Sequence, residues 1–366
     1  MDIYRDKRVI LTLDAGGTNF VFSAIREGEA ITEDVRKDAN AHDLDLCIST
    51  IISGFREVME QVSEKPAAIS FAFPGPADYP NGIIGDLNNL PSFRGGIPLK
   101  TILEDAFDLP VFINNDGDLF AYGEALAGIL PEINGKLETS GSMKRYYNLV
   151  GLTLGTGFGG GLVRNGQLFI GDNSTAAEVW LFSNRYSPDV NAEEVVSTRS
   201  VVRVYTEKAG IGYPTDLMPR DIYDIATGNR NGNKEAAMEA YRETGRALGD
   251  VVANLFTFTD GIIVIGGGIT GAKDLYMPSV MEELGASFHP ADSSDLPRLV
   301  QRIFNLDDPS ESKAFYKDYS KEIQVPGSDK KISYDPIPRL AIATSRIGAT
   351  RAISLGACAF ALNQLK

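Results

Sequence analysis

The 366-residue sequence contains only two cysteines, Cys47 and Cys358, which lie far apart in the chain. Two distant cysteines cannot build a disulfide framework or a thiolate zinc cluster, so a reducing compartment is expected. Basic residues are also scarce, because 35 Lys and Arg stand against 49 Asp and Glu and give a net charge of -14. Nucleic acids and anionic membranes are bound through basic surfaces, so neither is an expected partner.

Long apolar runs are absent as well. No stretch reaches the ~20 apolar residues that a membrane-spanning helix needs. The apolar run at residues 9–13 is too short for the core of a secretion signal, so we expect a cytoplasmic protein. A chain of 366 residues is too long for one compact core and suits two domains.

The segment VFINNDGDLFAYGE, residues 111–124, carries the carboxylate that is best placed for chemistry. Its first three residues are apolar and β-rich, which predicts the end of a buried strand. Helical spacing of apolar residues follows at once, with Asp116 or Asp118 as the expected N-cap. Open α/β sheets bind ligands at the ends of their strands, which makes Asp116 a candidate catalytic residue. A role limited to capping the helix is the alternative.

A glycine turn follows the first expected strand. Two β-rich runs flank the motif DAGGTN, residues 14–19, and together they predict a hairpin. Gly16 and Gly17 allow close backbone approach and Thr18 adds a hydroxyl, so the turn can present donors to a phosphate oxygen. Asp14 at the strand end can hold a hydrated magnesium ion. The alternative is a plain hairpin turn with a satisfied Asp.

Two further glycine turns come after expected strands. Residues 149–154 run into GTGFGGG, and residues 261–265 run into GGGITGA. The first repeats the strand, turn and strand of DAGGTN, as the first hairpins of two similar half-molecules would. The second can lay bare backbone against a base or a ribose, or it can be a tight connection from strand to helix.

The rest of the chain is read from its periodicity. Residues 131–148 are polar and predict an exposed loop or hairpin. Residues 287–339 fit either a helical insertion with a β-hairpin or a partner-binding arm. Apolar spacing predicts helices over residues 44–62, 99–107, 196–209, 234–258 and 348–365, and strands over residues 67–73 and 340–343.

As a set, the motifs resemble the ROK family (repressor, open reading frame, kinase) of bacterial sugar kinases and sugar-responsive regulators. The motifs are DAGGTN, FPGPAD, INNDGDLFAYGE, LTLGTGFGGGLVRNGQLFIG and IVIGGGITGA, in that order. The resemblance implies an α/β protein of the actin-like, hexokinase-type fold, with two ribonuclease-H-like domains and a cleft between them. The implied domains are residues 1–116 with 350–366, and residues 117–349 with a long insertion around 287–339.

The resemblance also implies roles for single residues. Asp116 matches the catalytic base, and Asp14 would hold Mg²⁺ through water. The candidate sugar contacts are Asn115, Glu178, Glu193, Gly75 and Asn89. The candidate nucleotide contacts are Asp14, Gly16, Gly17, Thr18 and Asn19, then Gly155, Thr156, Gly157 and Gly159, and finally Gly266, Gly267 and Gly268.

The sequence departs from the family pattern in one region. Leu181 stands where the family has a zinc-binding His, and residues 184–191, NRYSPDVN, lack the family's cysteines. We therefore expect no zinc site of the family type. The loop would then be held by packing, with Trp180, Phe182 and Tyr186 as candidates. An N-terminal helix-turn-helix is not expected either, because the motifs begin at Asp14.

The combined expectation is a sugar kinase that uses ATP and Mg²⁺ to phosphorylate a hexose or hexose derivative, with a sugar as its small-molecule partner and a homodimer as its assembly. A catalytically silent sugar sensor of the same family is the first alternative. An actin-like or chaperone-like ATPase is a second, which the Asn115 and Asp116 pair disfavours.

Overall fold

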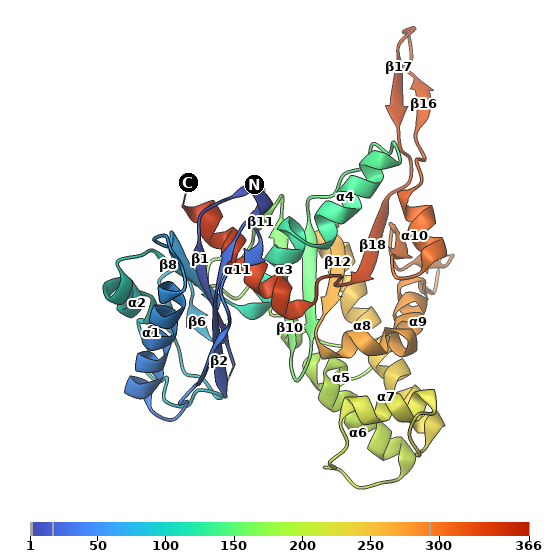
Figure 1. Ribbon diagram of the computed structural model, residues 1–366. Coiled ribbons are helices and arrows are strands. Elements are labelled where there is room, and N and C mark those ends of the chain that lie inside the picture. Colours follow the sequence, from blue (N-terminus) through green and yellow to red (C-terminus); the bar gives the residue numbers. More distant parts are fainter. Residues whose placement is uncertain (1–2, 17, 293, 366) are drawn as a thin grey trace. The chain divides into compact units, whose positions relative to one another are not determined.

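Figure 1 shows a computed structural model, which describes residues 3–16, 18–292 and 294–365. Its contacts divide the chain into two compact units. The first unit comprises Met1–Gly128, Gly161–Ala177 and Ile347–Lys366, and the second comprises Ile129–Gly160 and Glu178–Arg346. The domain limits expected from the sequence remain a prediction. Every helix in the described part of the chain is too short or too polar to cross a membrane.

The first unit is built on a mixed sheet with the strand order β3-β2-β1-β5-β8, and β4 also pairs with β2. The strands are β1 (Ile10–Ala15), β2 (Asn19–Arg26), β3 (Glu29–Ala30), β4 (Val35–Asp38), β5 (Ala68–Ala72) and β8 (Val111–Asn114). β1 and β2 form the expected antiparallel hairpin, whereas β5 and β8 run parallel to β1. Ala72 pairs with both Asp14 and Asn114, so the carboxyl ends of β1, β5 and β8 meet at one edge.

Helices cover both faces of this sheet, which explains why β5 is buried along its whole length. On one face, α1 (Leu44–Glu60) and α2 (Leu99–Phe107) pack into an aromatic core around Phe55 and Phe71. On the other, α3 (Asp116–Leu126) and α11 (Ala349–Gln364) pack against each other and the sheet. The unit also contains η1 (Ile3–Arg5), β6 (Ala77–Asp78) and β7 (Ile83–Ile84).

The second sheet has the order β11-β10-β9-β12-β18-β15. Its strands are β9 (Leu149–Leu154), β10 (Phe158–Arg164), β11 (Gln167–Leu168), β12 (Ile262–Gly266), β15 (Arg302–Asn305) and β18 (Arg339–Thr344). β12 runs parallel to β9 and to β18, and β15 runs parallel to β18. This order, a hairpin followed by parallel strands, repeats that of the first sheet.

The helices of the second unit centre on α8 (Lys234–Thr259), which contacts α9 (Lys273–Leu284) along much of its length. The two helices approach closely because Gly245 and Gly249 face α9, where a Cβ atom would meet Tyr276 and Glu283. The remaining helices are α4 (Ile129–Thr139), η2 (Val179–Leu181), α5 (Glu193–Val196), α6 (Thr198–Ala209), α7 (Pro219–Thr227), η3 (Gly268–Ala272) and α10 (Pro309–Tyr316).

Residues 287–339 contain helix α10, two β-hairpins and strand β15 of the second sheet. The expected helix and hairpin are present, and the expectation that this region is an insertion remains a prediction. The hairpins are β13 (Ser287–Phe288) with β14 (Leu296–Pro297), and β16 (Lys321–Gln324) with β17 (Lys331–Tyr334). In Figure 1 the second hairpin projects from the rest of its unit. A role as a partner-binding arm remains a prediction.

Most elements expected from periodicity are confirmed, and α2 has the expected bounds. The loop or hairpin expected over residues 131–148 is wrong, because α4 occupies its first part. The helix begins at Ile129, and its buried residues Ile133 and Leu137 follow at intervals of four. Pro131 and Gly135 have low helix propensity, which weakens the helical signal of residues 131–148.

The contact between α3 and α11 generates a stability prediction. A Cβ atom on Gly356 would lie 2.0 Å from the carbonyl oxygen of Leu119. We expect Gly356→Ala to lower the free energy of unfolding by about 1–3 kcal/mol, because overpacking forces the helices apart. Gly135→Ala in α4 is the matched control, since a Cβ atom there meets nothing within 4 Å. It should stabilise the protein by up to about 1 kcal/mol. Equal thermal shifts in both variants would contradict this packing.

Candidate active site

Two carboxylates lie at the carboxyl edge of the first sheet. Asp14 is the second-to-last residue of β1, and Asp116 is the first residue of α3, two positions after the end of β8. Phe73 N–H donates to the carbonyl of Asn114 (2.9 Å), which continues the pairing of β5 and β8 up to this point. Both side chains keep a solvent-accessible face. A ligand can therefore reach both carboxylates from the same edge.

The surroundings of Asp116 favour its protonated form. Its pKa is raised chiefly because nearby protein displaces water from the carboxyl group. The N–H of Gly117, which donates to Asp116 Oδ1 (2.8 Å), acts in the opposite sense, and the charge of Asp14 raises the pKa further. Desolvation also raises the pKa of Asp14, against the attraction of Arg36. A proton or a cation at this edge would relieve the repulsion between the two carboxylates.

Asn115, rather than Asp116 or Asp118, is the N-cap of α3, and it accepts from Gly117 N–H (2.8 Å) through its side-chain oxygen. This corrects the expected cap and leaves the Asp116 side chain in the first turn, beside the positive end of the helix dipole. The Asn115 amide group donates to Tyr79 Oη (3.4 Å), and Tyr79 donates to the carbonyl of Phe73 (3.0 Å).

Sequence reasoning missed Tyr79. The residue is buried, and a Cβ atom on Gly75 would lie 3.0 Å from its hydroxyl oxygen. It therefore connects two candidate sugar contacts, Gly75 and Asn115. No periodicity marks it, because it lies in an irregular loop. Asn89 is exposed, and among the described residues no hydrogen bond joins it to Asn115 or Asp116.

The first glycine turn is closed by a hydrogen bond from Gly16 N–H to the carbonyl of Asn19 (3.1 Å). A Cβ atom on Gly16 would lie 3.0 Å from that same oxygen, which explains the glycine. Thr18 is exposed, and its carbonyl accepts from Ala39 N–H (2.9 Å), so the turn is tied to the strand region that follows it. Gly17 lies outside the described residues.

The second glycine turn lies in the second unit and is held from two sides. Gly155 N–H donates to the carbonyl of Gly157 (2.9 Å), and Thr198 N–H, at the start of α6, donates to the carbonyl of Gly155 (2.9 Å). Thr156 is exposed at the tip. A Cβ atom on Gly159 would lie 2.6 Å from the Thr153 hydroxyl oxygen, so this position has no room for a side chain.

The two candidate sugar-binding glutamates already have partners. Glu193 Oε2 accepts from Phe158 N–H (3.0 Å), and its Oε1 pairs with Arg199 (2.8 Å). A Cβ atom on Gly157 would lie 2.9 Å from Glu193 Oε2. Glu193 thus supports the second glycine turn, a contact that the sequence did not predict. Glu178 accepts from the indole N–H of Trp180.

The third glycine motif follows β12. Gly267 has a φ of +93°, and a Cβ atom on it would lie 2.3 Å from the carbonyl oxygen of Leu154. Only glycine fits there, and the fit places Gly266 and Gly267 beside the end of β9. Gly268 opens η3, and a Cβ atom there would meet nothing within 4 Å, so its backbone is open on that side.

The edge of the second sheet holds a further charged group that sequence reasoning missed. Asp307 follows β15, accepts from Thr344 N–H (2.9 Å), and pairs with Arg346 (2.5 Å) and Lys273 (3.4 Å). A carboxylate placed after a strand was the available signal. This signal was missed because β15 is short and lies within residues 287–339, where no strand was expected at this position.

The loop at residues 184–191 is not held as expected. Phe182 is half-buried and Tyr186 is exposed, whereas Asn184 is fully buried and its amide group donates to the carbonyl of Ala247 (2.8 Å). Arg185 reaches buried carboxylates on α8 and α9. Tyr186 contributes through its hydroxyl group, which donates to Glu283, and half-buried Trp180 donates through its indole N–H to Glu178.

The raised pKa of Asp116 generates a prediction about stability. The folded protein binds the Asp116 proton more tightly than the unfolded chain does. The free energy of unfolding therefore falls as the pH rises from the ordinary pKa of 3.8 through the raised pKa of the folded state. We expect Asp116→Asn to melt higher than the wild type at pH 7, because the amide carries no charge to desolvate. The difference should shrink as the pH is lowered towards the ordinary value of 3.8. Thermal unfolding at several pH values measures this, with Asp105→Asn on the exposed side of α2 as control. Identical melting at pH 7 would contradict the prediction.

Comparison with known proteins places these motifs in a family. A profile of the ROK family matches residues 10–294. The glucokinase of Thermotoga maritima is 25% identical over 294 residues, covering 76% of this chain and 87% of its own. The N-acetyl-D-glucosamine kinase of Vibrio cholerae serotype O1 is 26% identical over 281 residues, covering 72% and 85%.

A crystal structure of a glucokinase from Parabacteroides distasonis superposes with a TM-score of 0.91, at 48% identity over 99% of both chains. The two repeated sheets are therefore those of the actin-like, hexokinase-type fold of such kinases. Because the family profile spans most of its length, the chain belongs to the ROK family.

Proposed function

We propose that this protein transfers the γ-phosphoryl group of ATP to a hydroxyl of a hexose or hexose derivative, with Asp116 as general base. The reaction class, that of a sugar kinase, is common to its ROK relatives. The carboxyl edge of the first sheet is the observation that carries the proposal. It presents an accessible carboxylate of raised pKa at a helix N-terminus, beside a second carboxylate.

Asp116 would accept the proton of the attacking hydroxyl. A general base works best when its pKa approaches the operating pH, and displacement of water by the surrounding protein moves the pKa of Asp116 in that direction. The Gly117 N–H orients the carboxylate before reaction, so little reorganisation is needed when the proton arrives. Tyr79 and the capping bond of Asn115 fix the start of α3, which keeps this carboxylate in place.

The glycine turns would bind the nucleotide through backbone groups. Phosphoryl transfer asks a protein mainly for position and charge compensation, and exposed N–H groups in tight turns provide both. Gly16, Thr18 and Asn19 would contact phosphate oxygens, and residues 155–159 would provide further backbone N–H donors. Gly266 to Gly268 would lie against the adenosine, because the open backbone at Gly268 leaves room for a planar group.

Asp14 fits a magnesium ion held mainly by water and phosphate. Its carboxylate is accessible and has a raised pKa, so a nearby cation would stabilise its charged form. In the described part of the chain no group of three or more His, Cys, Asp or Glu side chains could hold a metal ion. Mg²⁺ often binds through one or two carboxylates together with waters and substrate phosphates, so this donor set suits it. The ion would neutralise charge on the β- and γ-phosphates.

Asn115, Glu178 and Glu193 would orient the sugar, with Gly75 and Asn89 as further contacts.

A catalytically silent sugar sensor is the second candidate function. It is favoured by Leu181 and by the cysteine-free loop at residues 184–191, which depart from the zinc motif of the family. The homodimer, the cytoplasmic location and the lack of a nucleic-acid partner also stay predictions.

The proposal is tested by ADP release from ATP and Mg²⁺ across hexoses, N-acetylhexosamines and ketohexoses. We expect sugar-dependent turnover in the wild type and a loss of about 10²- to 10⁴-fold in kcat for Asp116→Asn, because the base is removed. Asp105→Asn, a charge change on α2 in the same unit, should keep full activity. If no sugar stimulates turnover while one still raises the melting temperature of both proteins, the sensor is the better account.

Asp14 generates a separate prediction. Asp14→Asn removes the proposed magnesium contact, so we expect the concentration of Mg²⁺ needed for half-maximal turnover to rise by about 10-fold or more. The sugar KM at saturating Mg²⁺ should stay close to that of the wild type. A magnesium titration of both proteins measures this. An unchanged Mg²⁺ requirement, or a loss confined to sugar binding, would contradict the role given to Asp14.

A further inference from the structure

A buried charge cluster lies between α8, α9 and residue 298, and we call it the loop anchor. Its members are Asp250 of α8, Glu283 of α9 and Arg298, whose side chains are each no more than 6% exposed. Arg298 pairs with both carboxylates. Gly249 makes this possible, because a Cβ atom there would lie 2.6 Å from the Glu283 side chain. The close approach of the two helices thus brings two carboxylates to one cation.

The loop at residues 184–191 is attached to this cluster. Arg185 N–H donates to Asp250 Oδ2 (3.0 Å), and the Arg185 guanidinium pairs with Glu283 (2.8 Å). The Tyr186 hydroxyl donates to the same carboxylate. Each buried carboxylate therefore has one buried cation and at least one group from the loop as partners. Removing the loop contacts would leave two buried negative charges facing a single Arg298, which is costly in a buried environment.

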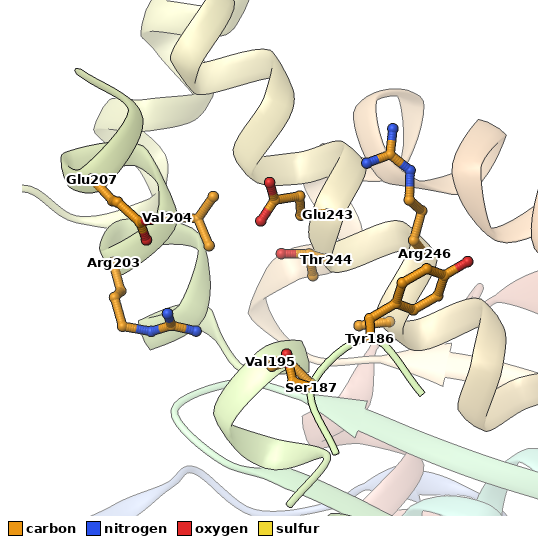
Figure 2. Close-up of a pocket in the computed structure, with 10 residues that line it drawn as sticks. Tyr186, Ser187, Val195, Arg203, Val204, Glu207, Glu243, Thr244 and Arg246 are labelled. Atoms are coloured by element: carbon orange, nitrogen blue, oxygen red, sulfur yellow. The ribbon is translucent and has the colours of Figure 1, made fainter. Parts of the chain in front are cut away.

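Apolar packing gives this loop little support. Figure 2 shows Tyr186 and Ser187 on one wall of a cavity of about 540 Å³, with Glu243 and Thr244 of α8 on another. Tyr186 is 46% exposed and Val190 is 43% exposed. The side of the loop that carries Tyr186 and Ser187 therefore faces the cavity rather than packed apolar side chains. Its position therefore depends on the polar contacts to the anchor and on buried Asn184.

The loop is continuous with a residue of the proposed active site. Its two ends are joined where Ala192 N–H donates to the carbonyl of Phe182 (2.8 Å) and where Ser183 bridges to Asn191. Glu193 follows directly and begins α5. A shift of the loop would move Glu193 relative to its partner Phe158 in the second glycine turn. The turn keeps a second contact, in which Thr198 N–H donates to the carbonyl of Gly155, so it would move less than Glu193.

We propose that the loop anchor, through Arg185, is a positioning cluster that fixes Glu193 for sugar binding. This inference rests on the proposed function, because it assigns Glu193 to the sugar. Arg185 and Arg298 touch no reacting atom in this scheme. They act by holding the loop, so their loss should appear in the affinity for sugar rather than in the phosphoryl transfer step or in nucleotide binding.

The test compares Arg185→Met with Arg246→Met. Arg246 is the matched control, because it lies one turn from Asp250 on α8, is similarly exposed, and pairs with Glu239 of its own helix (3.0 Å). We expect Arg185→Met to raise the sugar KM by about 10-fold, roughly the effect of losing one hydrogen bond between the sugar and a charged group. The ATP KM and kcat should stay near the wild-type values, and Arg246→Met should change none of the three.

Arg298 supplies a second variant pair. Arg298→Met is expected to raise the sugar KM at least as much as Arg185→Met, and Arg298→Lys to restore part of it by returning a cation to the carboxylates. Hydrogen exchange without ligand supplies a readout that does not require activity. The amides of residues 183–192 should lose protection in Arg185→Met and keep it in Arg246→Met.

Two outcomes would overturn the inference in an active enzyme. One is an unchanged sugar KM in Arg185→Met. The other is an equal fall in sugar affinity, nucleotide affinity and kcat, which would indicate general damage. If the wild type phosphorylates no sugar, the proposed function fails instead. The exchange data then decide separately whether the anchor holds the loop, and unchanged protection in Arg185→Met would refute it.

Discussion

The parallel register of β1, β5 and β8 is the constraint on which the proposed chemistry depends. Asp14 and Asp116 are about a hundred positions apart in the chain, yet both reach one edge because Ala72 of β5 pairs with Asp14 and with Asn114. β5 can occupy this central place only if both of its faces are covered. The last helix completes that cover, and Ser70 donates to the carbonyl of Ala357 within it (2.7 Å).

The same arrangement has a cost in stability. Two carboxylates held close together, one of them with water displaced around it, favour protonation and oppose folding at neutral pH. Pairs of like charges that shift pKa values are common at functional sites. The caps and hydrogen bonds around α3 hold the carboxylates in place despite this repulsion. Tyr79 belongs to this support as much as the residues of the motif do.

The second unit solves a different problem with buried charge. Its loop at residues 184–191 has no metal-binding side-chain set and little apolar cover, so ion pairs and amide hydrogen bonds determine its position. Buried ion pairs contribute little net stability, because desolvation offsets their attraction. They do impose one geometry, since any other leaves a buried carboxylate unpaired. That property suits a loop that leads into a residue of the proposed site.

Much of this protein was determined locally by its sequence. The glycine turns, the apolar spacing of α2 and α8, and the order of strands and helices could be read because each depends on neighbours within a few residues. The strand-end position of Asp116 followed from the same signals. The expected cap of α3, Asp116 or Asp118, was wrong, because Asn115 also has a side chain able to cap and only the structure shows that it does so.

Only the tertiary structure decided which polar groups meet. Tyr79 contacts Asn115, Asp307 pairs with Lys273 and Arg346, and Arg298 joins Asp250 to Glu283, all across separations in the chain that no periodicity records. The helix at residues 129–139 was missed for a different reason, because Pro131 and Gly135 lower its helix propensity although its apolar residues recur at helical spacing. Hydrophobic spacing specifies which face of an element is buried. The partner of a buried charge depends on which elements pack together, and the close approach of α8 and α9 at Gly249 sets that pairing here.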